Sequence, residues 1–321
     1  MGFSLFGNYN KPGPGVSKDE PPKPPLVRFW VIFFRKWTNF IKLNLLFMVP
    51  LSIAVALFFL INHFTGQPWI CFSPVILLYP FIAGLTYVTR NYAREEHAFV
   101  FSDFKDAIKN NWKYFFLNGV ICYLFYIVLS VSVNFYYPML EQGWWAYIPF
   151  GICIAISVLF IFAQYYIPVM IVTFDLKFKQ IYKNAFIFAI VGLWRNILLT
   201  LIFGIIILLN VFIFLTIGAL PPIVFLIDFL LIVLVAFSFC IYLINFAVYP
   251  LVEKLMIKPY YEKQHAAETP ELQNEKDPQQ SLTSDAENND EEDEGPEYVF
   301  VNGKLVKRQY LNDESVFEDR T

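Results

Sequence analysis

The sequence predicts an all-α membrane protein with six transmembrane helices arranged as three helical hairpins. Of its 321 residues, 57% are hydrophobic and only 16% are charged, whereas about a quarter of the residues in soluble domains are charged. Six separate apolar runs approach the roughly 20 residues that a membrane span requires. Basic residues occur only in alternate connections between these runs, which is typical of a chain that crosses a membrane repeatedly.

The six predicted spans differ in length. The first is short and the fourth is long, so we expect the fourth to tilt or to extend beyond the bilayer. Pro50, Pro80 and Pro168 lie within spans and predict kinks. The spans are Leu45–Asn62, Trp69–Thr89, Tyr114–Tyr137, Trp145–Thr173, Ile197–Ala219 and Ile223–Tyr249.

Charge placement favours an even number of spans. The connections Asn62–Pro68, Pro138–Trp144 and Leu220–Pro222 contain no Lys or Arg, so all 24 basic residues lie in the other loops and the terminal regions. Because basic loops remain on the cytoplasmic side, we expect a multi-pass protein of the plasma membrane with both termini in the cytoplasm.

Composition divides the chain into four regions. Residues 1–25 form a Pro-rich arm that we expect to be disordered, and residues 26–263 form the six-span membrane domain. Residues 264–297 form an acidic, disordered linker, and residues 298–321 form a tail with a short β-hairpin motif. The residues up to 263 carry 19 basic and 11 acidic side chains, a net charge of +8, while the remainder carries 5 and 16, a net charge of -11.

Basic, aromatic segments lead into the spans from the predicted cytoplasmic side. Phe101–Lys113 fits an amphipathic interfacial helix, and Phe178–Asn184 repeats part of its pattern. Residues 26–44 fit an interfacial helix and burial against the bundle equally well. We predict that Phe186–Trp194 continues an interfacial helix from Phe178, because a longer fifth span would place Arg195 in hydrocarbon. The basic residues expected to set topology and to contact lipid headgroups are Arg35, Lys36, Lys42, Arg90, Arg94, Lys105, Lys109, Lys113, Lys179, Lys183 and Arg195.

The tail contains a candidate docking element. Asn302-Gly303 is the strongest short hairpin signal, and apolar residues lie on both sides of it. An isolated two-stranded hairpin is marginal in water, so this one is either transiently ordered or completed by a partner through strand addition. The candidate docking residues are Tyr298, Phe300, Asn302, Gly303 and Leu305.

Asp228 is an ionisable side chain inside a predicted span, which makes it a functional candidate. The alternative is a structural carboxylate that is hydrated near the outer end of its span. Polar side chains in other spans that could meet it are Asn118, Asn134, Gln164 and Asn210.

No pattern of catalysis, metal binding or cofactor binding stands out. Four cysteines lie in predicted apolar helices without disulfide or metal-ligand spacing, which indicates inert buried thiols. The three histidines are far apart, and no phosphate-binding loop or nucleophile motif occurs. We therefore expect neither a cofactor nor a metal nor an enzyme. The basic segments adjoin apolar spans, which suits the lipid bilayer rather than nucleic acid.

Short motifs occur in order along the membrane domain: Asn44-Leu-Leu-Phe, Pro74, Pro80, Gly84-Leu-Thr-Tyr-Val, Arg90, Arg94-Glu95-Glu96, Phe101-Ser-Asp-Phe-Lys, Lys109-Asn110-Asn111, Thr173-Phe-Asp-Leu and Lys183-Asn184-Ala185. In these motifs the membrane domain resembles the YesL-like family of bacterial integral membrane proteins of unknown function, over roughly residues 35–255. This resemblance implies a Gram-positive bacterium and an accessory role in carbohydrate uptake by an ABC transporter, with transporter subunits or a membrane sensor as partners. It supplies no catalytic residues.

Three functions stay open on the sequence. The first is a non-enzymatic accessory protein of a carbohydrate transport system. The second is a small transporter or channel, which Asp228 and the kinked spans favour. The third is a membrane-anchored scaffold that binds partners through its C-terminal tail.

Overall fold

The computed structural model describes residues 24–216, 220–259, 298–301 and 304–307. The predicted Pro-rich arm, except for its last two residues, and the acidic linker lie outside these ranges. The described elements are α1 (Pro25–Arg35), α2 (Trp37–Thr65), α3 (Pro68–Cys71), the 3₁₀ segment η1 (Ser73–Leu78), α4 (Tyr79–Ala93), α5 (Val100–Met139), the 3₁₀ turn η2 (Trp144–Ala146), α6 (Tyr147–Thr173), α7 (Phe178–Val191), α8 (Leu193–Leu215), α9 (Pro222–Leu231), the π-helical segment η3 (Ile232–Ala236), α10 (Phe237–Val252), the π-helical segment η4 (Glu253–Ile257), β1 (Tyr298–Val301) and β2 (Lys304–Lys307).

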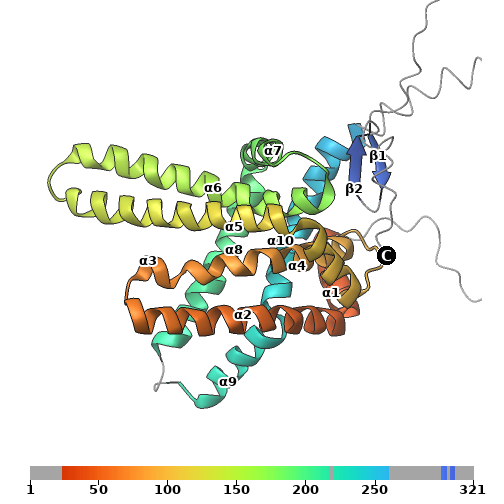
Figure 1. Ribbon diagram of the computed structural model, residues 1–321, viewed down its shortest axis with the longest axis horizontal. Helices are drawn as coiled ribbons and strands as arrows, with labels where there is room; N and C mark the ends of the chain where they lie inside the picture. Colours follow the sequence, from red (N-terminus) through yellow and green to blue (C-terminus); the bar gives the residue numbers. More distant parts are fainter. Residues whose placement is uncertain (1–23, 217–219, 260–297, 302–303, 308–321) are drawn as a thin grey trace, which may run out of the picture.

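Six helical segments in the described ranges are long and apolar enough to cross a membrane, which confirms the predicted fold class. They form three hairpins (Figure 1). α2 returns through α3, η1 and α4, α5 returns through α6, and α8 returns through α9, η3 and α10. The turns of the first two hairpins lie at one end of the molecule, while α1 and the end of α10 lie toward the other (Figure 1).

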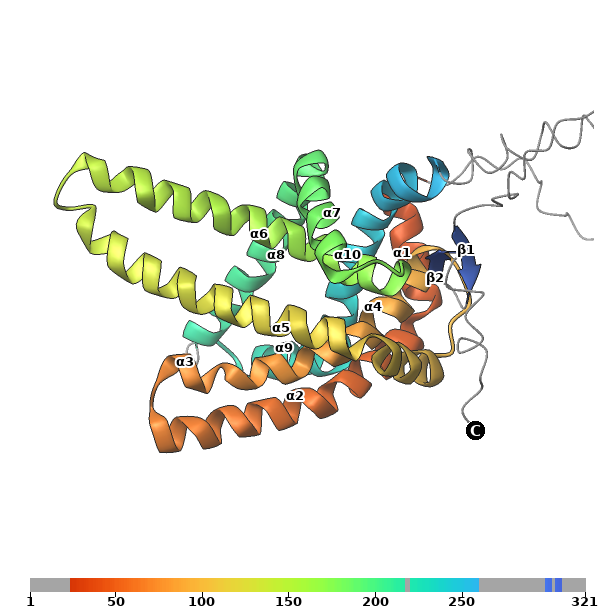
Figure 2. The same cartoon turned by 45° about the horizontal axis from the view of Figure 1, so that its top comes forward.

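Two basic segments differ in detail from the prediction. Phe101–Lys113 is the first part of α5, a single helix of 40 residues that is about 60 Å long, twice the thickness of the hydrocarbon core. α7 runs across α6 rather than alongside it (Figure 2). The run Phe186–Trp194 is divided, because α7 ends at Val191 and α8 begins at Leu193.

The second span is built from three pieces because of its prolines. Pro74 lies in η1, and Pro80 lies in the first turn of α4. Proline is tolerated there because the missing N–H would have no acceptor within the helix. The kink predicted at Pro80 is therefore a boundary between η1 and α4. Pro50 and Pro168 remain inside α2 and α6.

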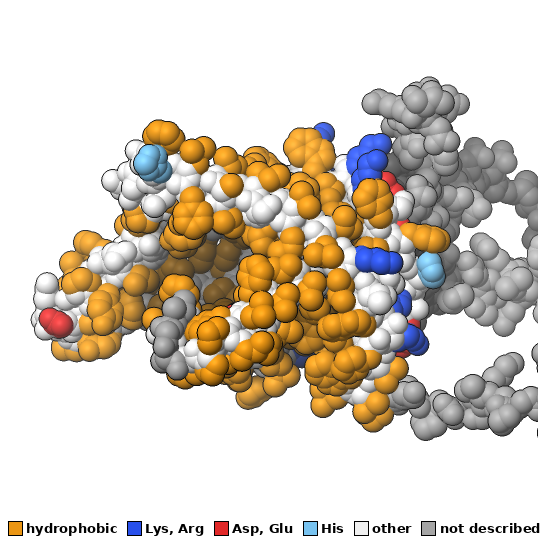
Figure 3. Space-filling model, turned by 90° about the horizontal axis from the view of Figure 1, so that it is seen from below, with side chains coloured by type: hydrophobic (Ala, Val, Ile, Leu, Met, Phe, Trp, Pro, Cys, Tyr) orange, Lys and Arg blue, Asp and Glu red, His pale blue; other side chains and the backbone are white. Residues whose placement is uncertain are grey.

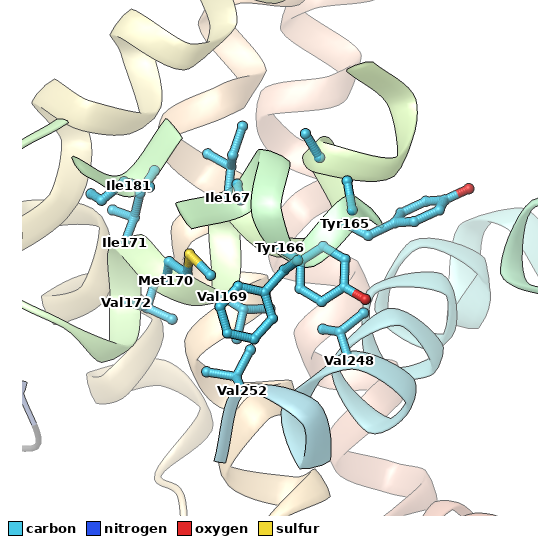
Figure 4. Close-up of a cluster of buried hydrophobic side chains, with 14 of the residues drawn as sticks. Tyr165, Tyr166, Ile167, Val169, Met170, Ile171, Val172, Ile181, Val248 and Val252 are labelled. Atoms are coloured by element: carbon cyan, nitrogen blue, oxygen red, sulfur yellow. The ribbon is translucent and has the colours of Figure 1, made fainter. Parts of the chain in front are cut away.

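One core cluster surrounds the second half of α6. Tyr166, Ile167 and Met170 are fully buried there, and Figure 4 shows them with Ile181 of α7 and Val248 of α10. This cluster joins the second hairpin to the third, so α6 is the central helix of the packed part.

A second core cluster places α1 against the bundle. The ring of Phe29 in α1 stacks on Tyr242 of α10 with 4.7 Å between centroids, and Tyr242 also contacts Phe40 of α2. Ile32 and Phe33 complete the buried face of α1. One face of residues 26–44 is therefore buried against the bundle, while apolar side chains such as Leu26 and Phe34 remain exposed.

Packing is concentrated toward the end where α1 lies. Buried residues extend no further than Ala54 in α2 and Gly119 in α5, and they begin at Ser157 in α6. Beyond these points the hairpin arms expose apolar side chains. Figure 3 shows hydrophobic side chains over most of one face and Lys and Arg gathered at one end. We call this the basic end.

The first two hairpins meet at a glycine. A Cβ atom added to Gly84 of α4 would overlap the ring of Phe104 in α5, and Phe104 is itself buried. Only glycine leaves room for this ring against the backbone of α4, and small residues are common where membrane helices pack.

Replacing Gly84 with Ala is expected to destabilise the protein by about 1–3 kcal/mol, the usual cost of overpacking a core. The measurement is the unfolding temperature of the purified protein in mild detergent. Gly204→Ala in α8 is the matched control, because a Cβ there meets nothing within 4 Å. Equal unfolding temperatures for the two variants would contradict the close packing of α4 on α5.

Candidate functional site

Arg90 is a buried cation that joins α4 to the end of α6. Its side chain is 1% exposed, and Nη1 donates to the carbonyl of Val172 at 2.7 Å and to Oγ1 of Thr173 at 3.2 Å. Nε and Nη2 donate to Oδ1 of Asn91, and the guanidinium lies 4.7 Å from the ring of Tyr87. A cation at the last carbonyls of a helix also complements its dipole.

The role of Arg90 in the structure is internal packing, whereas the sequence suggested headgroup contact. A buried charge is costly unless it is hydrogen-bonded. Within the described residues no carboxylate forms an ion pair with Arg90, and carbonyl, hydroxyl and amide oxygens satisfy it instead. The planar guanidinium can reach α6 and Asn91 at the same time, which an ammonium group cannot do.

We expect Arg90→Lys to lower the free energy of unfolding by about 2 kcal/mol, because buried acceptors lose their donors. Unfolding by denaturant in detergent measures this loss. Arg195→Lys is the control, since Arg195 is exposed and makes a single long hydrogen bond. A variant Arg90→Lys as stable as the control would show that the contacts with α6 contribute nothing.

Asn44 of α2 satisfies the irregular backbone of the last span. The segment η3 departs from regular α-helical hydrogen bonding, which leaves backbone groups in need of partners. Nδ2 of Asn44 donates to the carbonyls of Ile232 at 3.0 Å and Val233 at 2.7 Å. Its Oδ1 accepts from the N–H of Ser238 at 2.9 Å. The first and third hairpins are therefore joined through one buried amide.

Three more buried asparagines join pairs of helices. Asn245 of α10 donates to the carbonyl of Thr86 and to Oγ1 of Thr89 in α4, at 3.0 and 2.6 Å. Asn196 of α8 accepts from the hydroxyl of Tyr166 in α6 at 3.0 Å. The remaining bonds join Asn118 of α5 to Gln164 of α6, at 3.1 Å, and to the hydroxyl of Tyr182 in α7.

Asp228 of α9 does not meet the polar residues that the sequence suggested as partners. Its side chain is partly exposed and has neither a hydrogen bond nor an ion pair with the described residues. Asn118 and Gln164 bond to each other, while Asn134 and Asn210 each donate to a carbonyl of their own helix. Asp228 therefore lies apart from the buried polar contacts.

An ion cluster at the basic end fixes α1 to the end of α4. Oε1 of Glu95 lies 2.7 Å from Nε of Arg28, and its Oε2 lies 3.2 Å from Nη2 of Arg35. The hydrogen bond from Arg28 is the main reason that the pKa of Glu95 is lowered. Glu95 has a φ of 61°, an unusual left-handed conformation for a residue other than glycine.

The other predicted headgroup residues lie around this cluster. Lys36 donates to the carbonyl of Glu96 at 2.8 Å and lies over the ring of Tyr92, and burial lowers its pKa. Arg94 pairs with Glu96 at 2.6 Å. The remaining cations are exposed at the same end of the bundle: Lys42, Lys105, Lys109, Lys113, Lys179, Lys183 and Arg195.

The candidate docking tail is described only through its two strands. β1 and β2 pair antiparallel, with Tyr298 opposite Lys307 and Phe300 opposite Leu305. Asn302 and Gly303, which connect them, lie outside the described residues. Strand pairing on both sides of the predicted turn agrees with the hairpin motif.

The buried Asn contacts and the internal role of Arg90 were missed by sequence reasoning. Amide side chains inside apolar spans are a signal in themselves, because polar groups in hydrocarbon need partners. Their partners lie up to 194 positions away along the chain. Among the described residues no group of three His, Cys, Asp or Glu side chains is placed to hold a metal ion.

Six apolar spans, polar bonds between them and a basic end define a multi-pass membrane protein. Residues 40–133 match the model of a family described as "Protein of unknown function, DUF624". The matched region runs from α2 into α5 and contains Asn44, Gly84, Arg90 and Phe104. No curated protein and no solved structure matches the chain.

Proposed function

We propose that this protein is a non-enzymatic accessory component of a carbohydrate ABC transport system, and that it is a YesL-like protein of a Gram-positive plasma membrane. The resemblance of the membrane domain supports the choice of transport system. The structure supports a role in binding rather than in catalysis, because its buried polar side chains bond helices to each other. The observation that carries the proposal is that α8 and α9 form an arm with few buried residues.

The arm formed by α8 and α9 has few contacts with the rest of the molecule. The buried residues of α8 are Asn196 and Leu199, both near its start, and α9 has none. Large apolar side chains such as Leu208, Leu215 and Phe229 are more than half exposed. Lipid can cover such a surface, so apolar exposure alone does not require a partner.

Asp228 distinguishes this arm from a purely lipid-facing one. It lies six residues after the start of α9, about 9 Å along the helix axis. A carboxylate at the centre of a span costs roughly 2.5–3.5 kcal/mol on insertion scales, and less near the interface. A helix of a partner with a hydrogen-bond donor at this depth would offset that cost, so α9 is the proposed contact surface.

Asp228→Asn is expected to reduce the recovery of transporter subunits with this protein severalfold, because the charge is removed while the apolar surface stays. The measurement is affinity purification from mild detergent followed by identification of the bound chains. Glu141→Gln is the matched control, since Glu141 is an exposed carboxylate at the same end of the molecule, in the turn between α5 and α6. Recovery of the wild-type protein alone, together with unchanged growth on sugars after deletion, would refute the accessory role.

A small transporter or channel is the second candidate, and Asp228 is the observation that favours it. In that case Asp228→Asn would change solute flux in reconstituted vesicles that contain this protein alone. The hydrogen bond between Asn118 and Gln164 argues against a transporter, because these polar groups join helices and do not line a path for a solute.

A scaffold that acts through the tail is the third candidate. Gly303→Val tests it, because this change disfavours the turn between the strands. If the tail binds the partners, recovery of the partners would then be lost.

We further propose that both termini face the cytoplasm. The turn residues Gly66 and Gln67 and the segment Leu140–Gly143 carry no cation, and the described Lys and Arg side chains of the membrane domain lie toward the other end. Basic segments remain inside during insertion. A membrane-impermeant thiol reagent is expected to label Gln142→Cys in intact cells and Lys109→Cys only after permeabilisation. The reverse pattern would invert the topology.

A further inference from the structure

A pocket of about 1100 Å³ opens between α1, α8, α10 and the end of α4 at the basic end. It is larger than most small-molecule sites, which measure roughly 300–1000 Å³. Its charged lining consists of four arginines and two glutamates, which leaves two net positive charges: Arg28, Arg35, Arg94, Arg195, Glu95 and Glu253.

Within the part of the chain that the structure describes, Arg195 is the cation of this pocket that has no acidic partner. Glu95 is engaged by Arg28 and Arg35, and Arg94 pairs with Glu96. Arg195 makes a single long hydrogen bond, from Nη1 to the carbonyl of Ala247 at 3.4 Å. Among the described residues it has no carboxylate within ion-pair distance, although it stands in the first turn of a membrane-spanning helix.

Part of the pocket wall is apolar. Leu198, Phe246 and Val31 line it beside the arginines. Leu198 follows Arg195 by three residues, so it lies about 4.5 Å further along α8, toward the opposite end. Leu198 is 61% exposed, so the apolar wall is open to the acyl region of a bilayer. Arginines and apolar side chains that line one pocket match the two parts of a phospholipid.

We propose that this pocket binds one anionic phospholipid, with its phosphate at Arg195 and the neighbouring arginines and its acyl chains along α8 and α10. Arginine binds phosphate oxygens through paired, charge-assisted hydrogen bonds. Basic pockets between transmembrane helices commonly hold anionic headgroups. A free phosphate ester would share the first interaction but would leave the apolar wall uncovered.

Native mass spectrometry of the full-length protein in non-ionic detergent tests the proposal. Phosphatidylglycerol is the anionic probe, phosphatidylcholine the zwitterionic probe and glycerol 1-phosphate the soluble probe. We expect one molecule of phosphatidylglycerol to be retained in preference to phosphatidylcholine. Arg195→Gln is expected to weaken retention about tenfold, the effect of losing one charge-assisted bond. Glycerol 1-phosphate at matched concentration is expected to leave the bound lipid in place.

Lys109→Gln is the matched control, because it removes one exposed positive charge of α5 at the same end, outside the pocket. Its retention of phosphatidylglycerol is expected to equal that of the wild-type protein. If Lys109→Gln and Arg195→Gln weakened lipid retention equally, the retention would depend on general surface charge. That result would overturn the proposal that the lipid binds in this pocket. Displacement of the lipid by glycerol 1-phosphate would show that the pocket binds a soluble phosphate ester, and it would overturn the proposal that the ligand is a phospholipid. Equal retention of the two lipids would also overturn the proposal.

Discussion

Hydrogen bonds from buried asparagines to neighbouring helices are the constraint on which this structure depends. In a bilayer apolar side chains gain little by leaving lipid for each other, so helices associate through close packing and polar contacts. Asn44, Asn118, Asn196 and Asn245 are each fully buried, and each joins helices of different hairpins or of a hairpin and α7. Individual bonds of this kind stabilise membrane proteins by about 0.6 kcal/mol on average. They therefore matter as much for fixing which helices meet as for stability.

These contacts are concentrated toward the basic end, and the hairpin arms open away from it. The arrangement divides the molecule into a packed part and a lipid-exposed part. Rigid packing near α6 holds the arginines of the basic end in defined positions, which a binding pocket requires. The α8–α9 arm lacks such packing, so it can present α9 to another helix without first breaking internal contacts.

The arginines of this protein have different roles because their surroundings differ. Arg90 is enclosed by carbonyl and amide oxygens and acts as a link between α4 and α6. Arg28 and Arg35 hold α1 in place through Glu95. Arg195 is exposed and has no acidic partner in the described part of the chain, which leaves it available to an anion. In the sequence all four stand next to apolar runs, and their neighbours along the chain do not separate these roles.

The sequence by itself determined the number of spans, their pairing into hairpins and the end at which the cations collect. These features depend on apolar runs matched to the thickness of a bilayer and on the charges that flank them, which are local properties. Only the tertiary structure decided that Asn44 satisfies η3, that Arg90 is buried against Val172 and that four arginines share one pocket. Each of these depends on residues far apart in the chain, and short-range patterns do not specify which helix faces which.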